Sequence, residues 1–292
     1  MVIAIYGRPN KDNALPQVQE LFSKLEKLNI EVLVQNVFYS FIKEQFSLGA
    51  NVKTFSKHKE LKDTAHFLLS IGGDGTLLET IALVRDSGIP ILGINTGRLG
   101  FLANVSKDEI DQALSSLIDN KYTIDRRSLL HLDMETSSFG DLNFALNEMT
   151  VHARESSVMM TIHTYINDEY LNSYWSDGLI IATPTGSTAY SLSCGGPIMI
   201  PDSRNFIITP IAPHNLNVRP LIISDNDVVT LKLEGRSKSF MVSLDSRSAI
   251  VESATQLTIR KENFQINLVR LDGQNFIHTL RNKLLWGIDK RN

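Results

Sequence analysis

Three glycines and an aspartate follow an apolar run in the first half of the chain. Residues 68–76 read Leu-Leu-Ser-Ile-Gly-Gly-Asp-Gly-Thr, and helical spacing begins after them. Ligands of open α/β sheets bind at the carboxyl ends of strands, where glycines let a phosphate approach the backbone and a helix N-terminus supplies N–H groups. We therefore predict that phosphate binds at Gly72, Gly73, Gly75 and Thr76.

Asp74 needs a separate explanation, because a carboxylate beside a phosphate is repulsive unless it holds a cation or a hydroxyl proton. The residue types favour a general base, or an orienting group, for a hydroxyl that attacks a phosphoryl group. The alternative is a tight turn in which Asp74 only caps the helix. The chain contains neither GxxxxGK[ST] nor GxGxxG, so any nucleotide binds by another route.

Asn147 and Glu148 form a second candidate site. An amide offers both a donor and an acceptor, and a glutamate can accept hydrogen bonds from two vicinal hydroxyls, which is what a ribose requires. From the dipeptide alone, a polar pair at a strand edge is the favoured alternative.

The segment 174–197 combines several specific residue types. An apolar run over 179–182 leads into Thr-Pro-Thr-Gly-Ser-Thr and a short expected helix, and Asp177 precedes the run. Small hydroxyl residues at a helix start provide donors without bulk. A flat amide such as nicotinamide could be matched there by Asp177 and by backbone groups near Ala189. An unspecialised hydroxyl-rich loop is the weaker alternative.

These motifs together resemble a known family. The glycine turn is similar to the signature shared by NAD kinases, diacylglycerol and sphingosine kinases, and phosphofructokinases. Residues 177–190 closely resemble the Asp-Gly-x-x-x-x-Thr-Pro-Thr-Gly-Ser-Thr-Ala-Tyr motif of NAD kinases, and residues 95–101, 210–214, 219–220 and 244–246 add further similarity. The order and spacing match over nearly the whole chain, so the sequence is identified as a member of the NAD kinase family, bacterial type.

The resemblance implies transfer of the γ-phosphoryl group of ATP to the 2′-hydroxyl of the adenosine ribose of NAD, giving NADP and ADP. It makes Asp74 the proton acceptor, places the ribose or adenine at Asn147 and Glu148, and places the nicotinamide at Asp177. The NAD-binding residues that it implies are Asp74, Gly75, Phe101, Asn147, Glu148, Asp177, Thr188, Ala189, Tyr190, Ser193, Ala212 and Arg247.

The same resemblance implies Mg²⁺, or another divalent ion, held through the ATP phosphates and not by protein ligands. It also implies a homo-oligomer, a dimer or a tetramer. The chain departs from several relatives at Glu79, where they have His or Arg, and at Trp175, where a basic residue is frequent. A phosphate contact at position 79 is therefore in doubt, and Arg247 could replace a salt link lost at position 175. We interpret both departures as neutral surface changes.

The periodicity of apolar residues changes along the chain. Residues 1–125 alternate strand and helix patterns, which predicts a Rossmann-like parallel sheet covered on both faces. Residues 126–274 alternate with period two and predict an all-β, sandwich-like domain that binds NAD. Residues 275–292 return to helical spacing, and we expect that helix to pack back on the first domain.

Composition limits the class of protein. The 292 residues are 42% hydrophobic with net charge −3, which recommends neither a nucleic-acid nor an anionic-membrane partner. One cysteine, the absence of a signal-peptide pattern and the absence of a long apolar run favour the cytoplasm. No HExxH or Cys/His cluster suggests a protein-bound metal.

Three other functions remain open. A lipid kinase shares the glycine turn, but the chain lacks a basic amphipathic helix. A non-catalytic NAD sensor would not need Asp74, although that residue could also bind ribose. A protein that acts only through protein contacts would have no use for three polar motifs.

Overall fold

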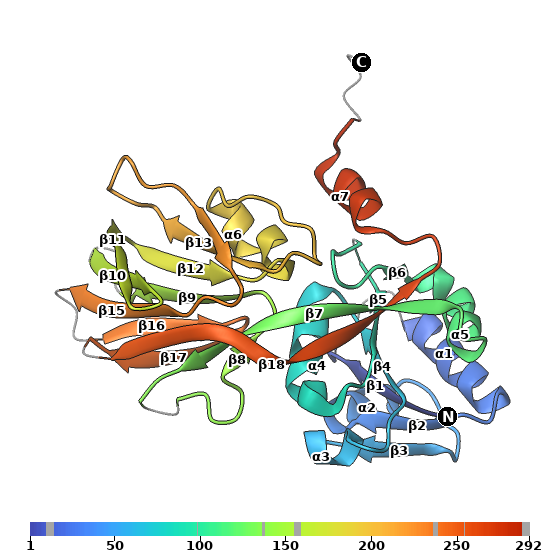
Figure 1. The fold of residues 1–292 in the computed structure, drawn as a ribbon. Helices are drawn as coiled ribbons and strands as arrows, with labels where there is room; N and C mark the ends of the chain where they lie inside the picture. Colours follow the sequence, from blue (N-terminus) through green and yellow to red (C-terminus); the bar gives the residue numbers. More distant parts are fainter. Residues whose placement is uncertain are drawn as a thin grey trace. The chain divides into compact units, whose positions relative to one another are not determined.

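The computed structural model describes residues 1–9, 15–97, 99–135, 138–154, 159–235, 239–253 and 255–287. Arg98, within one of the motifs, and residues 288–292, at the end of the expected C-terminal helix, lie outside these ranges. The chain forms two compact units, Met1–Arg126 with Ile266–Asn292 (unit 1) and Arg127–Gln265 (unit 2) (Figure 1).

The sheet of unit 1 is parallel. Its strands lie in the order β3 (Val52–Phe55), β2 (Glu31–Gln35), β1 (Val2–Gly7), β4 (Phe67–Ile71) and β5 (Ile91–Asn95). Beyond β5, the short strand β6 (Val105–Ser106) and the end of β18 (Gln256–Leu271) also pair in parallel with it. This is the parallel α/β sheet predicted for the first part of the chain.

Helices cover both faces of that sheet. The apolar residues of α1 (Leu15–Lys27), α2 (Asn36–Ile42) and α5 (Ile110–Ile118) share one core with Leu92 and Ile94 of β5. Helix α4 (Asp74–Val84) lies on the other face of the sheet. Side chains along a strand alternate between the two faces, and Leu92 and Ile94 point into the first core, so Gly93 faces the opposite side, where Leu77 of α4 contacts it. Helix α3 (His58–Leu61) packs beside α4, and α7 (Phe276–Leu284) also belongs to unit 1.

Short elements escaped the sequence interpretation. Ser106 and Glu109 form a capping box, in which Ser106 N–H donates to Glu109 Oε2 at 2.9 Å, and a 3₁₀ turn (Lys107–Glu109) follows before α5. Helices α2 and α3 and strand β3 were not predicted. They contain four to seven residues, which is too few for apolar periodicity to separate helix from strand.

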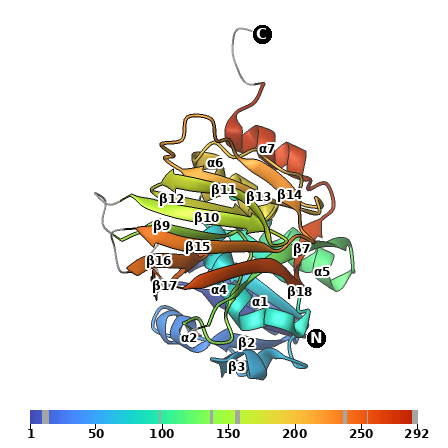
Figure 2. The ribbon, with the colours of Figure 1, turned by 60° about the vertical axis from the view of Figure 1, so that its left-hand side comes forward.

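Unit 2 is built from antiparallel strands. One sheet has the order β14 (Leu221–Ser224), β13 (Asn205–Ile211), β12 (Gly178–Ala182), β9 (Glu148–Ala153), β16 (Ser239–Leu244) and β17 (Arg247–Glu252) (Figure 2). The other contains β11 (Glu169–Ser176), β10 (Met160–Ile166), β15 (Val229–Gly235) and the first half of β18. Strands β7 (Tyr122–Asp133) and β8 (Phe144–Ala145) pair with each other beside β18.

The core of unit 2 lies between its two sheets. Met149, Leu179 and Phe206 of the first sheet share an apolar cluster with residues of β10, β15 and β18. On its other face, the first sheet carries Ile180 and Ile207 in a smaller cluster with Met199, over which a 3₁₀ turn (Thr185–Thr188) and α6 (Tyr190–Ser193) follow β12. The predicted fold class, a parallel α/β domain with an antiparallel sandwich, is confirmed.

Gly93 lets two elements of unit 1 approach β5 closely. A Cβ built there would lie 2.6 Å from the Cα of Ala103 and 2.8 Å from Leu77 Cδ1. We predict that Gly93→Ala lowers the free energy of unfolding by about 1–3 kcal/mol, because the backbone at position 103 has to move. Urea unfolding followed by circular dichroism measures the loss.

Gly235→Ala is the matched control for this measurement. The nearest atom to an added Cβ at that position is Phe240 Cζ at 3.3 Å, so a smaller change is expected. Equal losses in the two variants would contradict the steric explanation.

Candidate functional site

The predicted phosphate turn joins β4 to α4 in unit 1. Gly72 has φ of +151°, and an added Cβ would lie 2.3 Å from Thr76 Oγ1, so the chain itself requires a glycine there. At Gly73 and Gly75, in contrast, an added Cβ would meet no described atom within 4 Å. Their exposed faces suit the close approach of a ligand.

Asp74 is held by a neighbouring loop. Phe101 N–H donates to Oδ2 at 2.8 Å, and the N–H groups of Leu102 and Ala103 donate to Oδ1 at 3.0 and 2.8 Å. A Cβ at Gly100 would lie 1.8 Å from Oδ1, so only glycine fits over the carboxylate. The interpretation of Asp74 as a helix cap is wrong, because these bonds go to the loop and not to α4.

The loop between β5 and β6 is closed by its own residues. Asn95 Oδ1 accepts from Gly97 N–H at 2.7 Å, and Asn95 Nδ2 donates to Ala103 O at 3.3 Å. The Phe101 ring lies 6.4 Å from the Phe276 ring of α7, with Lys283 Nζ 5.7 Å from its centre. Phe101 therefore fixes Asp74 through its backbone while its half-buried ring packs beside α7.

Arg8 is a site residue that the sequence interpretation missed. The parallel register pairs Gly7 with Ile71, so Arg8 lies next to Gly72 at the carboxyl edge of the sheet. A cavity of about 190 Å³ lies between Arg8, the glycine turn and the rings of Phe38 and Phe41. The available signal was a basic residue directly after the first strand, at the edge where α/β sheets bind ligands.

Glu79 orients Arg8. Its carboxylate accepts from Arg8 Nε at 2.9 Å and from Arg8 Nη2, and the Tyr6 hydroxyl donates to it at 2.6 Å. The hydrogen bond from Arg8 is the main cause that lowers the pKa of Glu79. The interpretation of Glu79 as a neutral surface change does not describe these contacts, since the residue fixes a cation at the rim of the cavity.

Three strand ends of unit 2 meet at one edge. Strand β9 is antiparallel to both β12 and β16, with Glu148 opposite Ala182 and Met149 opposite Leu244. The start of β9 therefore lies beside the ends of β12 and β16. This edge brings together Asn147, Glu148, the hydroxyl-rich segment after β12 and Asp245 after β16.

The hydroxyl-rich segment packs against the Asn147 backbone. Thr183 N–H donates to Asn147 O at 2.9 Å, and a Cβ at Gly186 would lie 2.1 Å from that oxygen. The buried hydroxyls of Thr183 and Ser187 donate to backbone carbonyls, and Ser191 pairs with Thr209. The more accessible members of the predicted set are Thr188, Ala189, Tyr190 and Ser193.

Glu148 is buried with an unused acceptor. Its side chain accepts a hydrogen bond from Tyr190 N–H, while Oε2 has no partner among the described residues. Burial, with a contribution from the charge of Asp245, raises the pKa of Glu148 to about 8. Such a group suits a hydroxyl ligand, which can both donate to and accept from a carboxyl group.

Asp177 lies at the opposite end of β12 from Glu148. Asp177 directly precedes Gly178, and Glu148 pairs with Ala182, five residues further along, so the two acids are separated by about 17 Å along the strand at 3.4 Å per residue. The pKa of the Tyr190 hydroxyl is raised mainly by burial and by Cys194. Asp177 and Glu148 make smaller contributions, so Tyr190 lies within electrostatic reach of both acids. Two recognition points at this separation suit the two ends of an extended dinucleotide.

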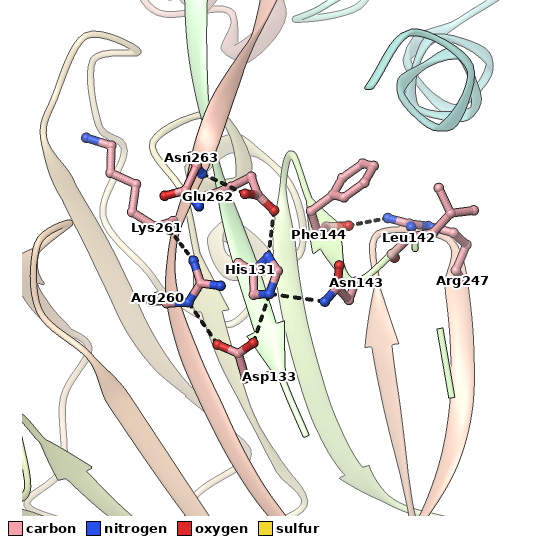
Figure 3. Close-up of polar contacts among 10 residues, drawn as sticks. All are labelled: His131, Asp133, Leu142, Asn143, Phe144, Arg247, Arg260, Lys261, Glu262 and Asn263. Atoms are coloured by element: carbon pink, nitrogen blue, oxygen red, sulfur yellow. Dashed lines mark hydrogen bonds and ion pairs between the residues drawn. The ribbon is translucent and has the colours of Figure 1, made fainter. Parts of the chain in front are cut away.

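The remaining predicted residues lie around these two points. Asp177 N–H donates to Ile211 O at 3.1 Å, which places Ala212 nearby with φ of +44°. Trp175 is half exposed, with its ring 5.1 Å from that of His214. Arg247 donates to the carbonyl oxygens of Leu142 and Phe144 (Figure 3).

The described residues contain neither a candidate metal-binding cluster nor a membrane-spanning helix. Within the described part of the chain, no three His, Cys, Asp or Glu side chains are grouped so that they could bind a metal ion. None of its helices has the length and hydropathy needed to cross a membrane.

Comparison with known structures supports the fold. The crystal structure of yeast NADH kinase complexed with NADH superposes with a TM-score of 0.88 at 21% identity, covering 98% of this chain and 88% of that one. A NAD kinase from Archaeoglobus fulgidus in complex with ATP gives a TM-score of 0.74 at 25% identity, covering 98% and 99%.

Sequence comparison adds the family. Residues 3–122 match the model of the ATP-NAD kinase N-terminal domain, and residues 146–271 match that of the C-terminal domain. The chain is 50% identical to a NAD kinase of Flavobacterium psychrophilum over 294 residues and 45% identical to one of Bacteroides fragilis over 291 residues, each alignment covering 100% of both chains. The chain belongs to the ATP-NAD kinase family.

Proposed function

We propose that this enzyme transfers the γ-phosphoryl group of ATP to the 2′-hydroxyl of the adenosine ribose of NAD, giving NADP and ADP. The observation that carries the proposal is Asp74, whose carboxylate is fixed by three N–H donors beside the open faces of Gly73 and Gly75. The ATP complex of the Archaeoglobus fulgidus relative supports ATP as the donor.

The role of Asp74 follows from its acceptor capacity. Its two oxygens offer about four lone-pair positions, of which the loop uses three. The remaining position accepts the proton of the ribose hydroxyl while the new O–P bond forms and the bond between the β,γ-bridging oxygen and the γ-phosphorus breaks. Because a sugar hydroxyl is a poor nucleophile, most of the catalysis comes from positioning and charge stabilisation.

On the acceptor side, Asn147 and Glu148 hold the adenosine ribose and Asp177 holds the nicotinamide end. The unused Oε2 of Glu148 supports a hydroxyl ligand there. In this proposal the rest of the NAD site consists of Asp74, Gly75, Phe101, Thr188, Ala189, Tyr190, Ser193, Ala212 and Arg247.

On the donor side, the ATP phosphates lie against Gly72, Gly73, Gly75 and Thr76, with Arg8 as an additional cation. The cavity between Arg8 and the turn supports this placement. Mg²⁺, or another divalent ion, would be held through the phosphate oxygens and not by protein ligands, and it would supply positive charge against the charge that develops on those oxygens.

Three further properties belong to the proposal. The functional division is an α/β domain over residues 1–125, with the helix of residues 275–292, and an NAD-binding domain over residues 126–274.

A homo-oligomer, a dimer or a tetramer, is supported by the exposed Leu216, Leu221 and Ile222 in and before the edge strand β14. The single cysteine fits the cytoplasm.

We predict that the purified chain makes NADP from NAD, ATP and Mg²⁺, and that Asp74→Asn lowers turnover by about 10²–10⁴-fold while NAD still binds. An NADP-specific dehydrogenase measures the product, and calorimetry measures NAD binding. Asp86→Asn, at an exposed carboxylate of the same unit, is the control. Full turnover in Asp74→Asn would remove the base role, and product formed only from diacylglycerol or a sphingoid base would reject the acceptor.

Arg8→Ala tests the donor side. We expect the KM for ATP to rise about tenfold and the KM for NAD to change less than twofold, because a charge-assisted phosphate contact is lost. Glu79→Gln keeps the cation and removes its charged partner, so a smaller rise is expected. Lys59→Ala, on exposed α3, is the charge control; the same rise in that variant would contradict a specific contact.

The raised pKa of Glu148 makes stability depend on pH. The folded protein holds the Glu148 proton up to pH about 8, so the stability contributed by the neutral form is present below the ordinary pKa and is lost as pH rises through 8. The side chain of the Glu148→Gln variant stays neutral at every pH. We predict that the free energy of unfolding of this variant rises relative to that of the wild type as the pH increases from 5 to 8.5. Urea unfolding without nucleotide measures this, and a difference independent of pH would refute the effect of burial.

A further inference from the structure

A buried carboxylate occupies the turn between β16 and β17. Asp245 has φ of +52°, a left-handed conformation that glycine adopts with the least strain, and its side chain is only 4% exposed. Burying a carboxylate costs free energy unless hydrogen bonds replace its hydration. The residue type at this turn therefore needs an explanation beyond closing the hairpin.

All hydrogen bonds of Asp245 described in the structure go to three consecutive residues. Oδ2 accepts from Leu146 N–H at 2.9 Å, and Oδ1 accepts from the N–H groups of Asn147 at 2.8 Å and Glu148 at 3.4 Å. The Asp245 N–H donates back to Glu148 O at 3.1 Å. The turn thus grips the backbone of the pair proposed to hold the ribose.

The other end of this segment is also fixed. Arg247, whose Nη2 lies 3.8 Å from Asp245 Oδ2, donates to the carbonyl oxygens of Leu142 and Phe144. Asn143 Nδ2 lies 3.1 Å from Nε2 of His131, which also contacts Asp133 and Glu262 (Figure 3). Residues 142–144 are thus anchored by other side chains, and the bonds to Asp245 act together with the Thr183 bond to the Asn147 carbonyl in holding the backbone of Asn147 and Glu148.

We propose that Asp245 is a positioning residue for NAD recognition, which fixes the backbone of Asn147 and Glu148 and places a second negative charge beside the Glu148 carboxyl. The inference rests on the proposed function, because it assumes that this pair binds NAD. Asp245 acts through the pair and does not contact the reacting atoms.

The charge of the Asp245 carboxylate affects the pH at which Glu148 titrates. The pH dependence of NAD affinity therefore distinguishes a positioning role from a merely structural one. Asp245 raises the pKa of Glu148, whereas Tyr190 N–H from α6 lowers it. Among the described residues, the charged and titratable groups on this side also include Arg247, which lies 3.8 Å from Asp245, and the Tyr190 hydroxyl with Cys194 and Asp177 near it. Burial raises the pKa of Asp245 itself, while its backbone hydrogen bonds and Arg247 act in the opposite direction. Removal of the Asp245 charge therefore shifts the titration of Glu148 to lower pH.

Asp245→Asn tests this in the full chain. Asparagine keeps the size of the side chain, but it loses the charge, and its NH₂ group cannot accept the Leu146 N–H bond. We expect the KM for NAD to rise about tenfold, the KM for ATP to stay within twofold, and the midpoint of the pH dependence of NAD affinity to move to lower pH. Steady-state kinetics and calorimetry between pH 6 and 9.5 measure these changes.

The matched control is Asp227→Asn in the turn between β14 and β15. Asp227 also fixes its surroundings, accepting from Ser224 N–H at 3.0 Å and from Asn167 Nδ2 at 2.8 Å, but it makes no described contact with residues 142–148. We expect both KM values and the pH midpoint to stay as in the wild type. The same NAD defect in both variants would overturn the assignment.

Further results of these experiments also support or overturn the proposal for Asp245. An unchanged KM for NAD with an unchanged pH midpoint in Asp245→Asn would overturn the proposal, as would equal losses for both substrates. If Asp245→Asn does not fold, Asp245→Glu is the second variant, because it keeps the charge while displacing the two acceptor oxygens. A raised KM for NAD with the wild-type pH midpoint in Asp245→Glu would support the proposal. Unaltered NAD affinity in that variant would overturn the proposal. NAD binding without NADP formation would defeat the proposed function and leave the calorimetric test of Asp245 intact.

Discussion

Each of the two units contains the same interaction, an aspartate carboxylate that accepts hydrogen bonds from three consecutive backbone N–H groups. Asp74 holds residues 101–103 in unit 1, and Asp245 holds residues 146–148 in unit 2. A carboxylate suits this task because its oxygens accept several bonds at once. Each aspartate thereby fixes a segment at a sheet edge: the loop of residues 101–103, and residues 146–148, which lead into β9.

Small residues make these interactions sterically possible. Gly100 leaves room for the Asp74 carboxylate, and Gly186 leaves room for the Asn147 carbonyl group. Neither glycine has an unusual φ, so each is required for close approach and not for a turn. The glycines of the motifs therefore fall into two groups: Gly72, Gly100 and Gly186 are demanded by the packing of the chain, while Gly73 and Gly75 leave open space for a ligand.

Sequence reasoning predicted the fold class better than it predicted the contacts that hold the candidate site residues. The two fold classes and the strands around Gly72 and Glu148 followed from periodicity and motif order. Arg8 and the role of Asp245 did not, because their importance comes from strand register: Gly7 opposite Ile71, and Leu244 opposite Met149. The small hydroxyl residues after β12 were predicted to provide donors as a group, but the hydroxyls of Thr183 and Ser187 donate to backbone carbonyls, which only the tertiary structure reveals.

The charges of the two units differ in a way that fits two different substrates. In unit 1 the glycine turn combines a helix N-terminus with Arg8, both of which favour phosphate groups. In unit 2 the site edge contains the carboxyl groups of Glu148 and Asp245, with Arg247 beside Asp245 and Asp177 at the far end of β12, so it favours phosphate groups less than the glycine turn does. Hydroxyl, amide and cationic groups would be accepted instead, as on the ribose and nicotinamide of NAD. A protonated Glu148 carries no charge, so it is not repelled by the neighbouring Asp245 carboxylate, and it still offers an acceptor. The raised pKa of Glu148 therefore lowers the electrostatic cost of placing the phosphates of a dinucleotide near this edge.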